Sequence, residues 1–290
     1  MNQTALIVEG GAMRGIFASG VLDAFLESRH NPFDLVIGVS AGAANLLGYL
    51  SQQRRRSYHI ITELASSGRF FDPLRFVRGG DLVDVGWLWQ ASFERYPLDW
   101  DVFDRFSGEF YVVATEVASG EPRYITVTPD NLLLAMQATS AMPLVQHTTP
   151  VINGEILADG GISDSIPVIE AYRRGARHLT VILSEPWGYR LKAPRFSWLL
   201  KQMLTTEPAL ACALLRREQC YNQALDFIAH PPADCHIELI APPADFAVAR
   251  FTRDRHRLET GYLQGYWRGR QALLGDTPLY SAHPVHLAPA

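Results

Sequence analysis

The chain has 290 residues, of which 48% are hydrophobic and 19% are charged, and its formal net charge is −4. This length is enough to bury the core of one large α/β domain or of two small ones. The negative charge argues against a nucleic-acid-binding protein, which would be basic. Three cysteines without a CxxC pair argue against a disulfide framework or a structural zinc site, and they are typical of a reducing compartment.

The first apolar run covers only residues 5–8 and has no basic leader before it, so it predicts a strand rather than a signal peptide. No window approaches the roughly 18 uncharged apolar residues that a membrane-spanning helix needs. We therefore expect a cytoplasmic protein, and peripheral contact with a membrane surface stays open.

Strand and helix patterns alternate along the chain. The β-type runs are 4–10, 33–40, 109–117, 122–128, 149–160, 178–185 and 235–242, and the helical patterns are 15–29, 41–53, parts of 54–105, 132–141, 167–176 and 254–273. Residues 118–121 carry a hairpin signal. Two βα units near the N-terminus indicate a parallel sheet. We predict a single domain over residues 1–290, with a three-layer α/β/α fold, a mainly parallel central sheet and a mostly helical last third.

The run 33–40 ends in a G-x-S-x-G sequence, with Ser40 between Gly38 and Gly42. Such a strand–turn–helix elbow exposes a serine Oγ, and its glycines remove side chains that would collide where strand and helix cross. The helix N-terminus also favours negative charge at Ser40. A chance match in a tight turn is the alternative. Because only one strand precedes it, the order differs from that of the standard α/β-hydrolase fold.

An earlier glycine turn, Gly10-Gly11-Ala12-Met13-Arg14-Gly15, also lies between a strand and a helix. Consecutive glycines there can form a nest of N–H groups that binds an anion. The glycine spacing does not match a dinucleotide fingerprint, so nucleotide binding has weak support. The other interpretation is an oxyanion hole for Ser40. Arg14 either adds positive charge near the site or binds a substrate phosphate, or it packs its stem and pairs with a carboxylate.

A serine nucleophile needs a proton acceptor. None of the nine histidines lies in a strand-end motif, and His147, His178, His283 and His286 fit structural or exposed positions better. Asp159 is the stronger candidate, because the run 149–160 delivers it to the Gly160-Gly161 turn. Apolar neighbours would raise its pKa by desolvation and make it a better base. A turn-forming Asp-Gly is the alternative.

Together these three sites resemble the patatin-like phospholipase family, whose members are serine acyl hydrolases with a Ser–Asp dyad. The glycine turn, with Arg14 and Gly15, matches the family's oxyanion loop, and residues 38–42 match its elbow. Asp159-Gly160-Gly161 matches its D-G-G/A motif, and residues 138–145 match a small-residue stretch before it. The resemblance covers about residues 4–185. The extension over about 190–290 has no assigned motif.

Three positions depart from the family pattern. Ala12 stands where a third glycine often occurs, Glu9 where an aspartate often occurs, and Ser165 where an asparagine often follows the D-G-G turn. The first two leave the dyad intact, and the third puts one supporting hydrogen bond in question.

The resemblance implies acyl transfer from a lipid or another carboxylic ester, with Ser40 as nucleophile, Asp159 as base and the N–H groups of Gly10, Gly11 and Ala12 as the oxyanion hole. It implies no metal and no organic cofactor. The alternatives are a soluble short-chain esterase or thioesterase, and a non-enzymatic binding protein on the same fold. The oligomeric state is not indicated.

Two aromatic stretches, 85–93 and 196–204, fit either an apolar lip at a membrane or acyl chain, or the core. The basic run 54–56 is more typical of a solvated helix face than of headgroup contact.

Overall fold

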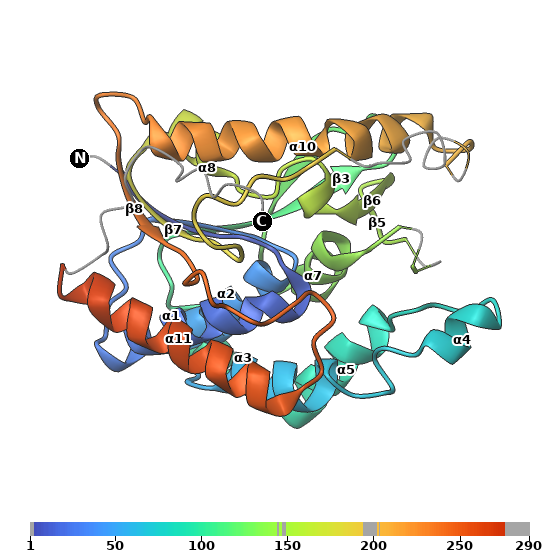
Figure 1. Cartoon of the computed structure of the whole chain (residues 1–290), viewed down its shortest axis with the longest axis horizontal. Helices are drawn as coiled ribbons and strands as arrows, with labels where there is room; N and C mark the ends of the chain where they lie inside the picture. The colour runs from blue at the N-terminus through green and yellow to red at the C-terminus, as the bar shows by residue number, and fades with distance from the viewer. Residues whose placement is uncertain (1–2, 144, 147–148, 194–201, 203, 276–290) are drawn as a thin grey trace, which may run out of the picture.

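The computed structural model describes residues 3–143, 145–146, 149–193, 202 and 204–275. A mixed β-sheet lies between two layers of helices (Figure 1). The strands are β1 (Gln3–Val8), β2 (Leu35–Val39), β3 (Glu109–Glu116), β4 (Pro122–Thr126), β5 (Val151–Ile152), β6 (Glu155–Asp159), β7 (Ala176–Ile182) and β8 (His236–Ile240). The α-helices are α1 (Ile16–Glu27), α2 (Ala41–Leu50), α3 (Arg56–His59), α4 (Pro73–Val77), α5 (Val85–Arg95), α6 (Trp100–Phe103), α7 (Leu132–Ser140), α8 (Val168–Arg173), α10 (Pro208–Ala229) and α11 (Arg255–Leu273).

The sheet has the order β5-β6-β3-β2-β1-β7-β8, and β4 pairs with β3. The five strands from β3 to β8 in this order are parallel to one another, whereas β4, β5 and β6 pair antiparallel. This arrangement confirms the predicted fold class, with its mainly parallel central sheet. The antiparallel β3–β4 pair also confirms the hairpin predicted at residues 118–121.

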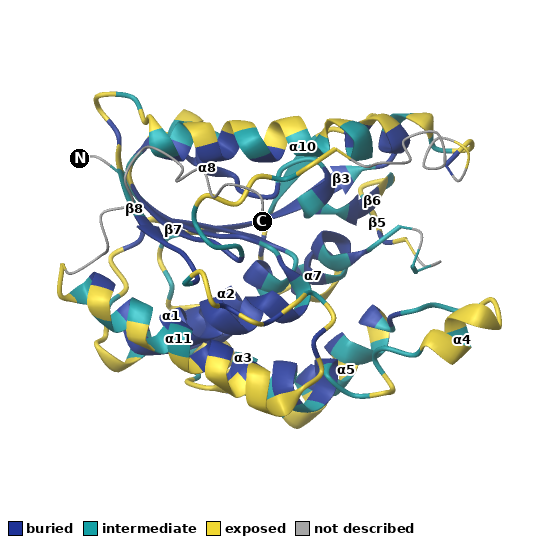
Figure 2. Ribbon diagram, in the orientation of Figure 1, coloured by how far each residue is buried: buried dark blue, intermediate teal, exposed yellow. Residues whose placement is uncertain are grey.

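Strand β1 shows why the sheet carries helices on both faces. Leu6 and Val8 belong to one buried cluster with α1, α2 and α11, whereas Ala5 and Ile7 belong to a second with α8 and α10. Neighbouring side chains of a strand point to opposite faces, so a strand that is apolar throughout needs cover on both. In Figure 1, α8 and α10 lie on one side of the sheet and α1, α2 and α11 on the other. Figure 2 shows the central strands as buried.

The C-terminal region is built into this same core. Strand β8 extends the parallel sheet by pairing with β7. Helices α10 and α8 pack against the same face of the sheet, and residues of β8 belong to that buried cluster. On the opposite face, α11 packs along α1, where the Tyr262 hydroxyl donates to Asp23 at 2.8 Å. Residues beyond 207 therefore contribute to both helical layers.

Strands β2 and β6 meet end to end beside β3. Val39, the last residue of β2, pairs with Val113, and Asp159, the last residue of β6, pairs with Ala114. Both strands use the same edge of β3, because β4 occupies the other edge over residues 111–115. β2 is parallel to β3 and β6 is antiparallel, so their carboxyl ends point at each other. This register brings the residue after β2 close to Asp159.

The run 149–160, expected to be one strand, is a hairpin in the structure. β5 and β6 are joined by Asn153 and Gly154, whose φ angles of 53° and 84° are both positive. Asn-Gly is the pair that favours such a two-residue turn, because both residues tolerate left-handed backbone. The expectation of a continuous strand was wrong at this point.

Some expectations fall outside the described residues. These are His147, His283 and His286, together with almost all of the aromatic stretch 196–204. Within the described part of the chain, no helix is both long and apolar enough to cross a bilayer.

Candidate active site

Ser40 lies on a strained turn between β2 and α2. Its φ and ψ are 52° and −121°, a conformation that costs a non-glycine residue about 1–3 kcal/mol. The strand and helix approach closely there: a Cβ on Gly38 would lie 2.5 Å from the Ala43 Cα, and one on Gly42 would lie 2.3 Å from the Val8 carbonyl oxygen. Both positions therefore require glycine, as the motif predicts.

The glycine turn lies directly against this elbow. A Cβ on Gly10 would lie 3.1 Å from the Ser40 Cβ. Within the described part of the chain, the N–H groups of Gly10, Gly11 and Ala12 donate no hydrogen bond, and all three residues line the same pocket as Ser40. Ala12 has φ of 50°, a left-handed conformation that favours glycine. Three free donors are thus available beside the serine.

Asp159 lies beside the Ser40 side chain, and both residues line the same pocket. The Oδ1 of Asp159 accepts from the Gly161 N–H at 2.7 Å. Burial raises the pKa of Asp159 above its usual value, and the contacts with Ser40 and Gly161 oppose that rise. The nearby charges of Arg217 and Arg250 also lower the pKa. The carboxylate therefore combines desolvation, which strengthens a base, with contacts that favour its ionised form.

Thr139 ties the elbow to the sheet, a role that the sequence did not indicate. Its Oγ1 accepts from the Ser40 backbone N–H at 2.9 Å and donates to the Val113 carbonyl at 2.5 Å. The residue is fully buried near the end of α7. Thr139 lies in the small-residue stretch 138–145, which the sequence marks because it precedes the strand that carries Asp159. Nothing in that stretch distinguishes the threonine from its neighbours.

The turn after Asp159 is braced from two sides. The Gly161 carbonyl accepts from Ser165 Oγ at 2.8 Å and from Arg217 Nε at 2.6 Å. Ser165 thus supplies a hydrogen bond at the position where asparagine is common in the family. Gly160 packs against β3, where an added Cβ would lie 2.2 Å from the Val113 carbonyl oxygen.

Arg14 pairs with a carboxylate, one of the two roles open for it. It lies 2.8 Å from Glu185 and donates to the carbonyls of Ser184 and Val248 at 2.7 and 2.6 Å. The guanidinium is buried and its polar contacts are made within the protein. Its effect on the glycine turn is structural, and Asn45 adds to this by donating to the Gly15 carbonyl at 2.7 Å.

Glu9 lies at the start of the glycine turn and is almost completely buried. It accepts from the Ser184 backbone N–H at 2.6 Å and from the Tyr221 hydroxyl at 3.0 Å. Burial raises the pKa of Glu9 from 4.5 to about 7, although both hydrogen bonds lower it. The turn is thus anchored by a carboxyl group that titrates near neutrality.

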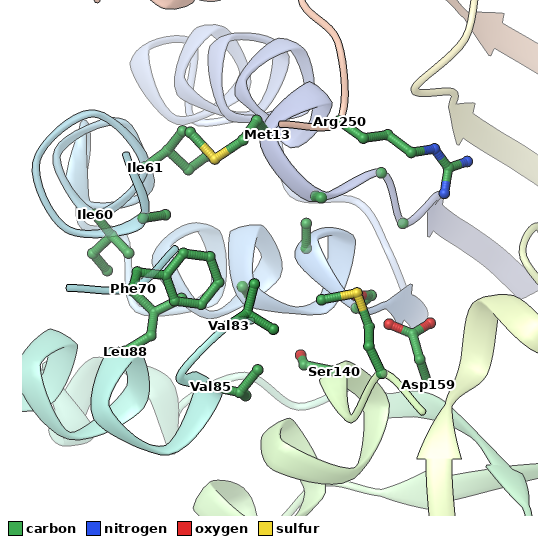
Figure 3. Close-up of a pocket in the computed structure, with 18 of the residues that line it drawn as sticks. Met13, Ile60, Ile61, Phe70, Val83, Val85, Leu88, Ser140, Asp159 and Arg250 are labelled. Atoms are coloured by element: carbon green, nitrogen blue, oxygen red, sulfur yellow. The ribbon is translucent and has the colours of Figure 1, made fainter. Parts of the chain in front are cut away.

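An apolar pocket extends from the serine and aspartate. In Figure 3, Ile60, Ile61, Phe70 and Leu88 lie on one side of the pocket, whereas Asp159 and Arg250 lie on the other. From the aromatic stretch 85–93, Val85, Leu88 and Trp89 line this pocket from α5. Val85, Leu88 and Trp89 thus form part of the pocket wall, and Trp89 is only 5% exposed, so it belongs to the interior and not to an exposed lip.

Arg56 does not lie on the solvated face expected for the run 54–56. It is buried and lines the pocket, its Nε donates to the Tyr96 carbonyl at 3.0 Å, and burial lowers its pKa to about 10. In the described part of the chain, no histidine lines the pocket, and His178 lies on β7 beside His236. The described residues also hold no group of three or more His, Cys, Asp or Glu side chains placed to bind a metal.

The fold and this pocket define an α/β protein with a serine at a strand–turn–helix elbow, and the comparisons identify its family. The family model "Patatin-like phospholipase" matches residues 6–172, and a model of a domain of unknown function matches residues 207–274. The chain is 39% identical over 253 residues to the uncharacterized protein YjjU of Escherichia coli (strain K12), covering 83% of this chain and 69% of that protein. The crystal structure of VipD from Legionella pneumophila aligns with a TM-score of 0.49 at 12% identity, over 95% of this chain and 67% of VipD.

The chain therefore belongs to the patatin-like phospholipase family, which places it among hydrolases of the lipase and phospholipase kind. The single domain over residues 1–290 stays a prediction. The match over residues 207–274 falls where the sequence offered no motif.

Proposed function

We propose that this protein is a serine acyl hydrolase that cleaves carboxylic esters of lipids, with Ser40 as nucleophile and Asp159 as base. The observation that carries this proposal is the close approach of the two side chains at the head of an apolar pocket. Two strands that meet end to end on β3 hold them there. Membership of a family of lipid hydrolases supports the same reaction class.

The first half of the reaction forms an acyl-serine. Asp159 accepts the proton of Ser40 as the Oγ attacks the ester carbonyl carbon. The N–H groups of Gly10, Gly11 and Ala12 donate to the oxyanion of the tetrahedral intermediate, where such donors are typically worth about 100- to 1000-fold in rate each. The bond from the carbonyl carbon to the alcohol oxygen then breaks. The departing alcohol takes the proton from Asp159.

The second half returns the free enzyme. Asp159 accepts a proton from water as the water oxygen attacks the acyl carbon. The acyl–Oγ bond breaks, Ser40 regains its proton from Asp159, and the fatty acid leaves. Asp159 must be ionised at the start of both halves, which the contact with Ser40 and the hydrogen bond from Gly161 favour.

Peripheral contact with a lipid surface fits the shape of the segment around α4. This segment leaves the pocket at Phe71 and returns at Val83, which bridge to each other. Between them, Leu74 and Val77 are 67% and 83% exposed. Figure 2 shows α4 as an exposed projection of the molecule. We include insertion of this tip into a lipid surface in the proposal. The cytoplasmic location stays a prediction.

The test is hydrolysis of p-nitrophenyl acyl esters, from short to long chains, by the wild type and by the Ser40→Ala and Asp159→Asn variants. We expect the wild type to prefer the longer chains that its apolar pocket can bury, and both variants to lose at least about 1000-fold in kcat. Ser57→Ala, which also removes a pocket hydroxyl, is the matched control and should retain activity. Full activity in either dyad variant would refute the proposal.

A further inference from the structure

Arg56 brings a buried positive charge to the mainly apolar wall of the pocket. The residue is 4% exposed and lines the pocket from the first turn of α3. Its Nε donates to the Tyr96 carbonyl at 3.0 Å, which holds the guanidinium at the carboxyl end of α5. Among the described residues, its two terminal nitrogens, Nη1 and Nη2, are buried without a hydrogen-bond partner. A buried charged donor without an acceptor is costly, so the fold alone leaves this group unsatisfied.

The carboxylates on the elements packed around Arg56 have partners of their own. These pairs are Asp23 with the Arg55 N–H and the Tyr262 hydroxyl, Glu27 with Arg54, Glu63 with Arg95, Glu94 with Gln90, and Asp99 with the Val102 N–H. Over the described ranges, no carboxylate forms an ion pair with Arg56. Burial alone lowers the pKa of Arg56, to about 10, so the side chain is a cation at neutral pH. This part of the pocket therefore holds a positive charge without a counter-ion.

Helix α2 shows that Arg56 lies far along the pocket from the nucleophile. The helix begins directly after Ser40, and Ala44 and Asn45 line the pocket along it. Gly48 follows further along α2, where an added Cβ would lie 3.7 Å from the Arg56 Cβ. The helical rise from Ser40 to Gly48 is about 12 Å, at about 1.5 Å per residue. The pocket wall thus runs along α2 from the nucleophile towards Arg56.

Helix α5 lines the pocket towards the same end. Leu88 and Ser92 are one turn apart and both line the pocket, and Tyr96, whose carbonyl holds Arg56, follows one turn later. Figure 3 shows Leu88 across the pocket from Asp159. An acyl chain that begins at the nucleophile and follows these apolar walls therefore ends near the guanidinium.

We propose that Arg56 binds a carboxylate at the far end of the acyl chain, so that the pocket selects half-esters of dicarboxylic acids over esters of simple fatty acids. This inference rests on the proposed function and names the substrate class of the same site. A guanidinium presents paired N–H donors in a fixed fork that matches the two oxygens of a carboxylate. Because Nε is held by Tyr96, Nη1 and Nη2 provide that fork, and an aliphatic chain end would leave both unpaired.

The first experiment compares the turnover of two esters with the same chain length, the p-nitrophenyl half-ester of sebacic acid and p-nitrophenyl decanoate. We expect the wild type to have a kcat/KM about 10- to 100-fold higher for the half-ester, the range that charge-assisted hydrogen bonds provide. The difference should lie mainly in KM, because a contact at the chain end is the same in the ground state and the transition state. Half-esters of suberic and dodecanedioic acid, each against its simple ester, should show that the preference peaks at one length.

Two variants of Arg56 and one matched control locate the carboxylate. Arg56→Met removes the charge and keeps an unbranched side chain, and Arg56→Lys keeps the charge without the fork. Arg54→Met removes an exposed charge two residues away and is the control. Each protein is judged by its own ratio of half-ester to simple-ester kcat/KM, so a general loss of activity cancels. The preference should disappear in Arg56→Met, be reduced in Arg56→Lys and stay at the wild-type value in Arg54→Met.

The second experiment measures binding without turnover, by calorimetric titration of the inactive Ser40→Ala protein. The probes are monomethyl sebacate, methyl decanoate and free decanoate. Monomethyl sebacate should bind about 10- to 100-fold more tightly than methyl decanoate, and adding Arg56→Met should remove the difference. Free decanoate tests whether the carboxylate comes from a fatty acid bound in the reverse direction instead of from the far end of an ester.

Three outcomes would overturn the inference. A wild type with no half-ester preference in turnover or binding would remove the subsite, and a preference that survives in Arg56→Met would place it elsewhere. Decanoate that binds through Arg56, with no half-ester preference in turnover, would assign the arginine to free fatty acids. The two proposals fail separately, because a wild type inert on every ester refutes the proposed function, whereas the probe affinities test Arg56.

Discussion

Replacing Glu9 with glutamine should make the folded protein more stable at alkaline pH. Burial raises the pKa of Glu9 to about 7 from an ordinary 4.5. Because the folded-state pKa is the higher one, protonated Glu9 stabilises the fold. That stability is fully present below pH 4.5 and is lost as the pH rises through about 7. One pKa unit is worth about 1.4 kcal/mol, so the ionised carboxylate costs up to about 3 kcal/mol at pH 8.

Glutamine keeps the size of the side chain and both hydrogen bonds, since its amide oxygen accepts from Ser184 and its amide nitrogen can donate to Tyr221. Urea unfolding followed by circular dichroism at pH 5 and pH 8 measures the difference. We expect Glu9→Gln to exceed the wild type by up to about 3 kcal/mol at pH 8 and by much less at pH 5. Glu94→Gln, at an exposed site on α5, should match the wild type at both. A Glu9→Gln protein that is less stable than the wild type at pH 8 would refute the reasoning.

Three further predictions concern the pocket and its rim. Ala12→Gly relieves a left-handed backbone and should raise the free energy of unfolding by up to about 1 kcal/mol, whereas Ala44→Gly within α2 should lower it by about 1 kcal/mol; thermal unfolding distinguishes them. Thr139→Val leaves the nucleophile's N–H without its acceptor, so kcat should fall more than KM changes, and Thr139→Ser should restore it; a valine variant with normal kcat would contradict this. Replacing both Leu74 and Val77 with serine should slow the hydrolysis of vesicle lipid and leave the hydrolysis of a soluble ester unchanged. Equal effects on the two hydrolysis rates would exclude a lipid-contacting role for α4.

The sequence predicted the parts of the site that depend on local chemistry. Gly38 and Gly42 are required by the close crossing of β2 and α2, so the elbow can be read from a few adjacent residues. Asp159 followed by two glycines is similarly local. Short apolar runs that alternate with helical patterns also predicted the sheet, because a strand that is buried on both faces is apolar throughout.

The remaining parts of the site depend on contacts between distant segments. No local pattern indicates that β6 would continue the line of β2 along one edge of β3, which is what brings Ser40 and Asp159 together. Thr139, Arg217 and Arg250 act through one or two hydrogen bonds or through charge, on elements far away in the sequence. The sequence around an arginine on a helix or in a loop does not indicate which distant turn its side chain will contact.

The region that matches a domain of unknown function contributes residues to the pocket that contains Ser40. Its helix α10 supplies Arg217, Arg250 lies between β8 and α11, and β8 completes the parallel sheet. Removing residues 207–274 would thus expose the apolar face beneath α10 as well as remove two cations from the pocket. Substitution of the individual arginines is for this reason the cleaner test of what the region contributes to the pocket.

The central claim is that Ser40 attacks the ester and that Asp159 activates it. The most direct measurement is covalent labelling with an alkyl fluorophosphonate, followed by mass spectrometry of the peptides. We expect a single label on the peptide that contains Ser40, and labelling at least about 100-fold slower in Asp159→Asn, which keeps the shape of the side chain but cannot accept the proton. Label on another serine, or labelling of Asp159→Asn at the wild-type rate, would contradict it.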